Sequence, residues 1–266
     1  MSMNPQSIEI GSTQIRILST VKGLVSEAKM VEDEINSFEP KLVALSVGPD
    51  EVEGTRRWDG QPYDMSGWDE IYGLSLRKLV GDDGVRLPPP SFSTAIKVSD
   101  SKNIEVIGID MDEESFTQSY TSNISAWQLY KRARLETRMM KNGIEGNTPE
   151  EIVTNMENSI REIVGFAKLE EHRVEALYVN LVNQLDKEKI LAIIDFTNVE
   201  FLKKRLMSYN PTKSKTLVME KEQNKATKSS EKETDKDTES SVNITNIYYN
   251  IKDSVINKSD LSNKEK

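Results

Sequence analysis

Two aspartates follow one of the apolar strands that the sequence predicts. Asp110 and Asp112 come directly after the apolar stretch at residues 104–109. Open α/β sheets place their sites at the carboxyl ends of their strands, and a pair of carboxylates there could bind a divalent cation. The alternative is structural, because Asp112 suits the cap of a helix whose first turn would contain Glu113 and Glu114. We favour this structural interpretation.

Two more polar residues follow expected strands. Lys22 comes after the strand at residues 14–19, and Asn198 comes after the strand at residues 190–194. Because parallel strands end at one edge of a sheet, both side chains could face a cleft together with Asp110 and bind a small polar ligand. A lysine there could act as a base only if burial lowered its pKa. The simpler interpretation, which we favour, is that Asn198 caps the next helix and Lys22 lies in solvent.

Charged residues also gather on two expected helices. One of them carries a cluster of Glu170, Glu171, His172 and Arg173. His172 is the single histidine of the chain, so one chain cannot build a site from several histidines. On another helix, a basic face could bind phosphate. Because the chain is acidic overall, we expect its cations to pair with acids such as Glu136. This basic face consists of Lys131, Arg132, Arg134 and Arg138.

The composition excludes several classes of function. The 266 residues carry a formal net charge of −9, which argues against a broad nucleic-acid-binding face. The absence of cysteine excludes disulfides, thiolate zinc sites and cysteine nucleophiles, and it suits a reducing compartment. No apolar stretch of about 18 residues is present, and the first residues lack the features of a signal peptide. We therefore expect a cytoplasmic protein without a membrane span. The usual nucleotide, zinc-protease and hydrolase motifs are also missing, so we expect no cofactor.

Strand and helix signals alternate along the first 219 residues. This order predicts an α/β fold with a mixed, largely parallel sheet that opens with a hairpin around Gly11 and Ser12 and is covered by helices. The expected strands cover residues 7–10, 14–19, 41–47, 104–109 and 190–194, with a possible last strand at 215–219. The expected helices cover residues 25–38, 68–80, 92–98, 125–141, 148–166, 168–185 and 199–207. The stretch at 48–65 is expected to be a loop, and Thr148 is expected to cap a helix that begins at Pro149, with Glu151 completing a capping box.

The remaining residues differ in composition from this α/β domain, which we place at 7–219 with a long helical segment at 125–186. Residues 220–241 have mixed charge and few apolar side chains, so we expect a disordered linker. Residues 242–259 regain β-branched and aromatic side chains, and we expect this short segment to become ordered on binding a partner or a second copy. A flexible tail is the alternative.

The order of the segments resembles the TraB family, which belongs with the PrgY, GumN and Tiki-like proteins. That family opens with a strand, a G-T-x-H motif, an amphipathic helix and a strand that ends V-x-x-E-L. Residues 15–46 follow this frame without gaps, including F-x-P-K-x-V-A-L at residues 38–45. Residues 88–112 match the family's P-G-x-E-M helix, strand and D-R-D in outline, and residues 171–206 match its E-R-D helix, apolar strand, G-x-x-H and helix. The resemblance extends over about residues 13–208.

The resemblance implies that the motif residues line one pocket, which some relatives use for metal-dependent hydrolysis of peptides or esters. Here Lys22 and Asn198 stand where the family has histidines, while Ser46 and Ser93 stand where it has glutamates. Such changes remove four potential metal ligands, and the Lys22 ammonium would repel a dication. The implied pocket consists of Thr20, Lys22, Ser46, Ser93, Asp110, Asp112, Glu171, His172, Arg173 and Asn198.

We therefore expect a non-catalytic TraB-like protein that acts in binding, assembly or regulation. Its partner, or a second copy, would bind through the helices at 125–185 and the segment at 242–259. One alternative is a metal-dependent hydrolase whose rebuilt site uses Asp110, Asp112 and Glu171. Another is a sensor of a small polar ligand that uses Lys22, Ser46, Ser93 and Asn198.

Overall fold

A five-stranded sheet organises the described part of the chain. The computed structural model describes residues 5–58, 60 and 67–209. The strand order is β1-β2-β5-β3-β4. β1 pairs antiparallel with β2, and the other neighbours are parallel. The strands are β1 (Gln6–Ile10), β2 (Thr13–Thr20), β3 (Leu42–Leu45), β4 (Glu105–Gly108) and β5 (Lys189–Asp195).

The predicted fold class and hairpin are confirmed. Gly11, in the turn between β1 and β2, has a φ of 60°, a conformation that glycine adopts at little cost. The helices are α1 (Glu27–Phe38), α2 (Pro49–Arg56), α3 (Trp68–Val80), α4 (Pro90–Ser101), α5 (Glu113–Asn123), α6 (Ala126–Asn142), α7 (Pro149–Arg161), α8 (Val164–Val182) and α9 (Phe196–Met207). The predictions for 215–219, 220–241 and 242–259 lie outside the described residues.

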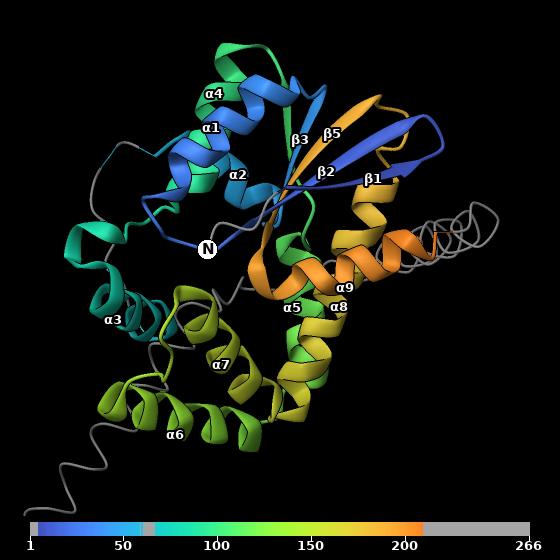
Figure 1. Cartoon of the computed structure of the whole chain (residues 1–266). Helices are drawn as coiled ribbons and strands as arrows, with labels where there is room; N and C mark the ends of the chain where they lie inside the picture. The colour runs from blue at the N-terminus through green and yellow to red at the C-terminus, as the bar shows by residue number, and fades with distance from the viewer. Residues whose placement is uncertain (1–4, 59, 61–66, 210–266) are drawn as a thin grey trace, which may run out of the picture. The chain divides into compact units, whose positions relative to one another are not determined.

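Each face of the sheet is covered by its own helices (Figure 1). α1 and α4 pack on one face, where Val31 and Phe92 join Val43 and Ile193 in one buried cluster. α9 and the second half of α8 cover the opposite face. The central strand β5 is therefore buried on both sides, which explains its continuous run of apolar residues.

α8 connects the sheet to a second apolar cluster. Leu177 and Leu181, in its second half, pack against the sheet. Phe166 and Leu169, in its first half, pack with side chains of α3 and α6 such as Ile71. The middle of α8 therefore lies where the sheet core meets the helical segment, and this is where its charged residues occur.

One stretch that we expected to be a loop contains a helix. α2 begins at Pro49 and occupies part of the stretch at 48–65. Proline suits the first helical position, and the Glu51 carboxylate accepts a 3.4 Å hydrogen bond from the Gly48 N–H. These local signals for the start of a helix outweigh the low apolar content of the stretch at 48–65. At α7, Thr148 caps the helix as predicted, but Glu151 accepts a hydrogen bond from the Asn147 N–H.

Two glycines allow the backbone at the carboxyl ends of β3 and β4 to approach very closely. A Cβ atom added to Gly108 would lie 2.6 Å from the carbonyl carbon and oxygen of Gly48, and one added to Gly48 would lie 2.7 Å from the Met111 carbonyl oxygen. Backbone cannot move aside as a flexible side chain can.

We expect Gly108→Ala to lower the free energy of unfolding by about 1–3 kcal/mol in urea titrations. Gly54→Ala is the matched control, because nothing lies within 4 Å of its added Cβ, and it should be neutral or stabilising. Equal effects of the two substitutions would contradict the prediction.

Candidate functional site

The carboxyl ends of the parallel strands form the region where a site is expected. β2 continues into α1 on one face, whereas its neighbour β5 continues into α9 on the other. Connections that leave neighbouring strands toward opposite faces open a crevice between them. Thr20 lies opposite Asp195 in the register of β2 and β5. The polar residues that follow both strands therefore meet at this edge.

A group of buried and half-buried polar side chains, which we call the inner cluster, occupies this edge. It consists of Lys22, Glu27, Tyr72, Asp195 and Asn198. Glu27 Oε1 accepts a 2.7 Å hydrogen bond from the Val21 N–H. The second oxygen of Glu27, one oxygen of Asp195 and the amide oxygen of Asn198 are buried without a hydrogen-bond partner.

The inner cluster shifts the titration of its own members. Burial raises the pKa of Glu27 to about 8, and the Asp195 and Glu150 carboxylates add to this rise against the opposing effect of the Val21 N–H. Burial also raises the pKa of Asp195 to about 6, although the Lys22 ammonium opposes the change. Burial, together with the carboxyl groups of Asp195, Glu27 and Asp69, raises the pKa of the Tyr72 hydroxyl well above its usual value. These effects place Lys22, Glu27 and Tyr72 within electrostatic range of Asp195. Asn198 follows Asp195 by three positions, in the first turn of α9.

A second arrangement, the ion-pair chain, runs beside the inner cluster. Arg173 binds Asp110 through Nε at 3.0 Å and Nη2 at 2.5 Å, and it binds Glu170 through Nη1 at 3.1 Å. Glu170 also lies 3.7 Å from Arg161, which donates a 3.0 Å hydrogen bond to Glu157. Asp110 and Glu170 are only 5% and 8% exposed. The ion-pair chain therefore connects α7 and α8 to Asp110, in the loop that follows β4.

The Arg173 guanidinium is held in its charged form. Burial lowers the pKa of Arg173, but the carboxylates of Asp110 and Glu170 outweigh burial and raise it above its usual value. Burial raises the pKa of Glu157, and the Glu170 charge adds to the rise while Arg161 opposes it. The arrangement is a charge network that links structural elements.

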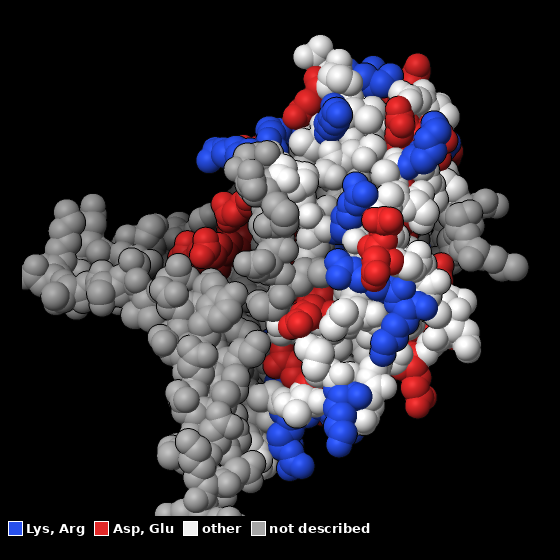
Figure 2. Space-filling model, turned by 90° about the vertical axis from the view of Figure 1, so that its left-hand side faces the viewer, with Lys and Arg blue, Asp and Glu red and all other residues white. Residues whose placement is uncertain are grey.

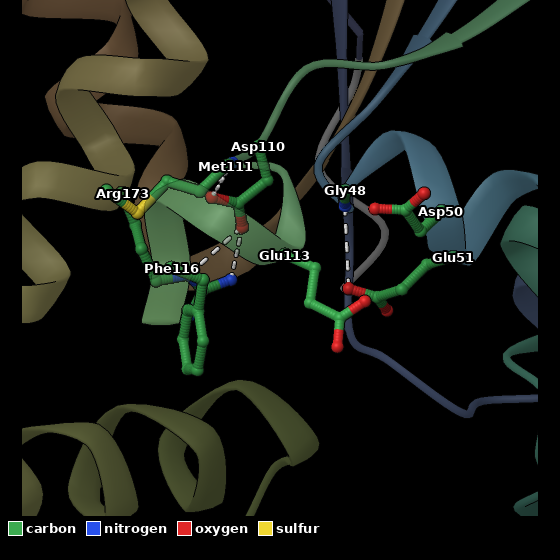
Figure 3. A pocket seen from close by; sticks show the side chains of 8 residues that line it. All are labelled: Gly48, Asp50, Glu51, Asp110, Met111, Glu113, Phe116 and Arg173. Atoms are coloured by element: carbon green, nitrogen blue, oxygen red, sulfur yellow. Dashed lines mark hydrogen bonds and ion pairs between the residues drawn. The ribbon is translucent and has the colours of Figure 1, made fainter. Parts of the chain in front are cut away.

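A pocket of about 400 Å³ lies at the ends of β3 and β4 (Figure 3). Its lining includes the ion pair of Asp110 and Arg173, and the acids at its rim come from the first turns of α2 and α5. The lining residues are Gly48, Asp50, Glu51, Asp110, Met111, Glu113, Phe116 and Arg173. Because carboxylates outnumber the single arginine, the pocket is unsuited to a phosphate group.

No family model matches the chain, and no curated protein matches it significantly. The TraB resemblance therefore remains a proposal, and the geometry of the individual residues decides what the site can do. The described part of the chain contains no helix long and apolar enough to cross a membrane.

Four residues of the implied pocket lie at the ends of β2, β3 and β5. Thr20 is buried, and its hydroxyl donates to the Ile194 carbonyl at 3.5 Å. Ser46 is buried, and its hydroxyl accepts a 2.9 Å hydrogen bond from the Asp195 N–H. Lys22 is half-buried, and Asn198 is 3% exposed and lies within α9, whose cap is Asp195. The expectations of a capping Asn198 and a solvated Lys22 were therefore wrong.

Other residues of the implied pocket have separate structural roles. Asp112 caps α5 by accepting a 2.8 Å hydrogen bond from the Ser115 N–H, as the structural interpretation predicted. The Ser93 hydroxyl donates to carbonyls one turn earlier in its own chain. Glu171 and His172 are exposed, and Nδ1 of His172 lies 2.7 Å from the Ser119 hydroxyl.

The alternative metal site built from Asp110, Asp112 and Glu171 is not supported. Asp110 is bound to Arg173, Asp112 caps a helix, and Glu171 faces solvent. Within the described residues, no group of three or more histidine, aspartate or glutamate side chains is arranged to hold a metal ion.

The sequence alone missed several charged members of the site. Asp195 directly ends an apolar strand, which is the same signal that identified Asp110, so it could have been found. Glu27 and Glu170 lie on helices among other acids, and nothing in the local pattern separates a buried glutamate from an exposed one. Their roles depend on how α1 and α8 pack against the sheet.

Proposed function

We propose that the protein is a non-catalytic binding module with a TraB-like scaffold, and that it holds a small polar ligand at the inner cluster. The observation that carries this proposal is the set of three buried oxygens without a partner, on Glu27, Asp195 and Asn198. A buried acceptor without a hydrogen bond costs about 1–3 kcal/mol, so a fold retains several of them together only when something compensates. A ligand that donates hydrogen bonds would provide that compensation.

The residues of the inner cluster define the chemical class of the ligand. Near pH 7, Asp195 and Asn198 present acceptors that call for hydroxyl or ammonium donors, whereas the protonated Glu27 carboxyl can itself donate a hydrogen bond. The Lys22 ammonium forms no ion pair with a described carboxylate within 4.0 Å, so it is available to an acceptor on the ligand. Its positive charge also disfavours a bare dication beside Asp195. The preferred ligand is therefore a small molecule with both donors and acceptors, such as an amino acid or a polyol.

The ion-pair chain supports a binding role over hydrolysis. A metal-dependent hydrolase needs carboxylates that are free to coordinate its ion. Asp110, the best-placed carboxylate at the end of β4, instead binds Arg173 through two nitrogens. The hydroxyl of Ser46 is engaged with the backbone of Asp195. These side chains are engaged in holding the strand ends in place and are not free to coordinate an ion.

A thermal-shift panel of amino acids, amines and polyols tests this function. Binding only to the native state at 100 times Kd stabilises a protein by about 2.7 kcal/mol, which corresponds to a Tm rise of about 5–10 °C for a domain of this size. Asn198→Leu and Asp195→Asn should abolish the rise, whereas Ser93→Ala should leave it unchanged. The proposal would be contradicted if no compound raised Tm, or if the rise in Tm were unchanged by Asn198→Leu and Asp195→Asn.

We also propose that the protein is cytoplasmic and associates with a protein partner or a second copy through the helices at 125–185. The exposure of Val164, at 63%, supports this surface. Sedimentation velocity of the full chain should then show a dimer or larger species. A single monomeric species at all concentrations, with no co-purifying partner, would count against it.

A further inference from the structure

The outer face of α6 carries four cations that no described acid pairs. Lys131, Arg134, Arg138 and Lys141 are all exposed. The ion pairs within the described residues involve other lysines and arginines. Elsewhere acidic and basic side chains are interspersed, as over much of the surface in Figure 2. The expectation that the basic face pairs with acids was therefore wrong for Lys131, Arg134 and Arg138.

Two aromatic side chains extend the same face. Trp127 is 62% exposed and Tyr130 is 48% exposed, and their ring centroids lie 5.2 Å apart in a stacked arrangement. The Lys131 ammonium lies 6.0 Å from the centre of the Trp127 ring. At 100° per residue, these aromatic residues and the four cations fall within an arc of about 100° that contains no acid. The stripe from Trp127 to Lys141 is about 21 Å long.

The fold uses only the opposite side of α6. Leu135 and Met139 are buried in the helical cluster. The Arg132 guanidinium faces inward, 5.2 Å from the Trp68 ring centre and 4.8 Å from that of Phe166. The outer cations therefore have no role in packing within the described residues. Four like charges along one face also repel one another, which favours an anionic partner outside the domain.

We propose that the α6 stripe binds the anionic surface of a phospholipid membrane. Tryptophan and tyrosine rings are favoured at the boundary between headgroups and acyl chains, and lysine and arginine chains beside them bind anionic headgroups. The stripe lies along the outside of a single straight helix, which fits a flat surface. A single-stranded nucleic acid needs a groove with successive stacking platforms, whereas Trp127 and Tyr130 stack on each other.

Co-sedimentation of the full chain with vesicles tests the proposal. Vesicles with about 30% phosphatidylserine in phosphatidylcholine should bind the protein at low salt, and pure phosphatidylcholine should not. Each cation near an anionic leaflet raises the membrane binding constant about five-fold, so Lys131→Gln with Arg138→Gln should lower this constant about 30-fold. Trp127→Ala should weaken binding at all salt concentrations, because it removes an apolar contact that salt does not screen.

The matched control neutralises two exposed lysines of another helix region, Lys97→Gln with Lys102→Gln, and should retain binding. Thermal melting shows whether each variant remains folded. Equal binding to both kinds of vesicle, or equal losses in the control, would overturn the proposal. So would binding of a labelled 20-nucleotide RNA through the same cations without vesicle binding. Loss of a dimer by the α6 variants, with no vesicle binding, would assign the face to self-association and also overturn it.

Discussion

Replacing Arg173 by methionine is expected to lower the free energy of unfolding by about 3–5 kcal/mol. Arg173 is the shared partner of Asp110 and Glu170, whose side chains are 6% and 11% exposed. Without the guanidinium, two carboxylates remain where water cannot solvate them well. The cost arises from these unpaired acids and exceeds the net stabilisation that the ion pair provides. Urea titration of the wild type and the variant measures the difference.

A more exposed ion pair, which joins α9 to α8, provides the control. Arg205 binds Glu175, and their side chains are 48% and 32% exposed. Arg205→Met should therefore cost less than about 1 kcal/mol. A triple variant with Asp110→Asn, Glu170→Gln and Arg173→Met should recover most of the lost stability, because it leaves no buried charge uncompensated. A loss for Arg173→Met no larger than that of Arg205→Met would show that the two acids are not dependent on this arginine.

The sequence predicted the strands and their largely parallel pairing more accurately than it predicted which helix residues contact the strand ends. Each parallel strand is an apolar run bounded by polar residues, so Lys22, Ser46 and Asp110 could be placed at one edge from parallel pairing alone. The pairing of Arg173 with Asp110 joins residues that are 63 positions apart. This pairing depends on how α8 is rotated about its own axis and on how far α8 lies from the sheet. The sequence pattern of α8 determines neither the rotation nor the distance, because both halves of the helix are apolar but pack in different clusters.

The two misjudged polar residues have a common physical explanation. Asn198 and Lys22 each follow a strand, where turn residues are usually solvated or capping. Here α9 begins directly at the end of β5, with Asp195 as its cap, so Asn198 is carried into the helix and buried. Lys22 is half-buried in the stretch between β2 and α1, close enough to Asp195 to affect its pKa. Short connections at this edge bring polar side chains inward, and the inner cluster results from that shortness.

The stability of the protein is expected to fall as the pH rises from about 5 to about 8, chiefly because of Glu27. Burial raises the pKa of Glu27 from 4.5 to about 8. Between these two values the native state keeps a proton that the unfolded chain has lost, so each pH unit lowers the free energy of unfolding by about 1.4 kcal/mol. Below pH 4.5 and above pH 8 this contribution is constant. Asp195, with a pKa of about 6, adds a similar loss over the lower part of the range.

Glu27→Gln should therefore stabilise the protein at pH 9, by up to about 4 kcal/mol, and change it little at pH 5. Glutamine retains an oxygen that can accept the Val21 N–H but cannot ionise beside Asp195, Glu150 and Tyr72. Urea titrations at both pH values measure the effect. Glu9→Gln makes the same chemical change on an exposed side chain of β1 and should have no effect at either pH. If Glu27→Gln destabilised the protein equally at pH 5 and pH 9, the carboxyl group would act through its hydrogen bond alone, and a proton held by Glu27 would not explain the pH dependence.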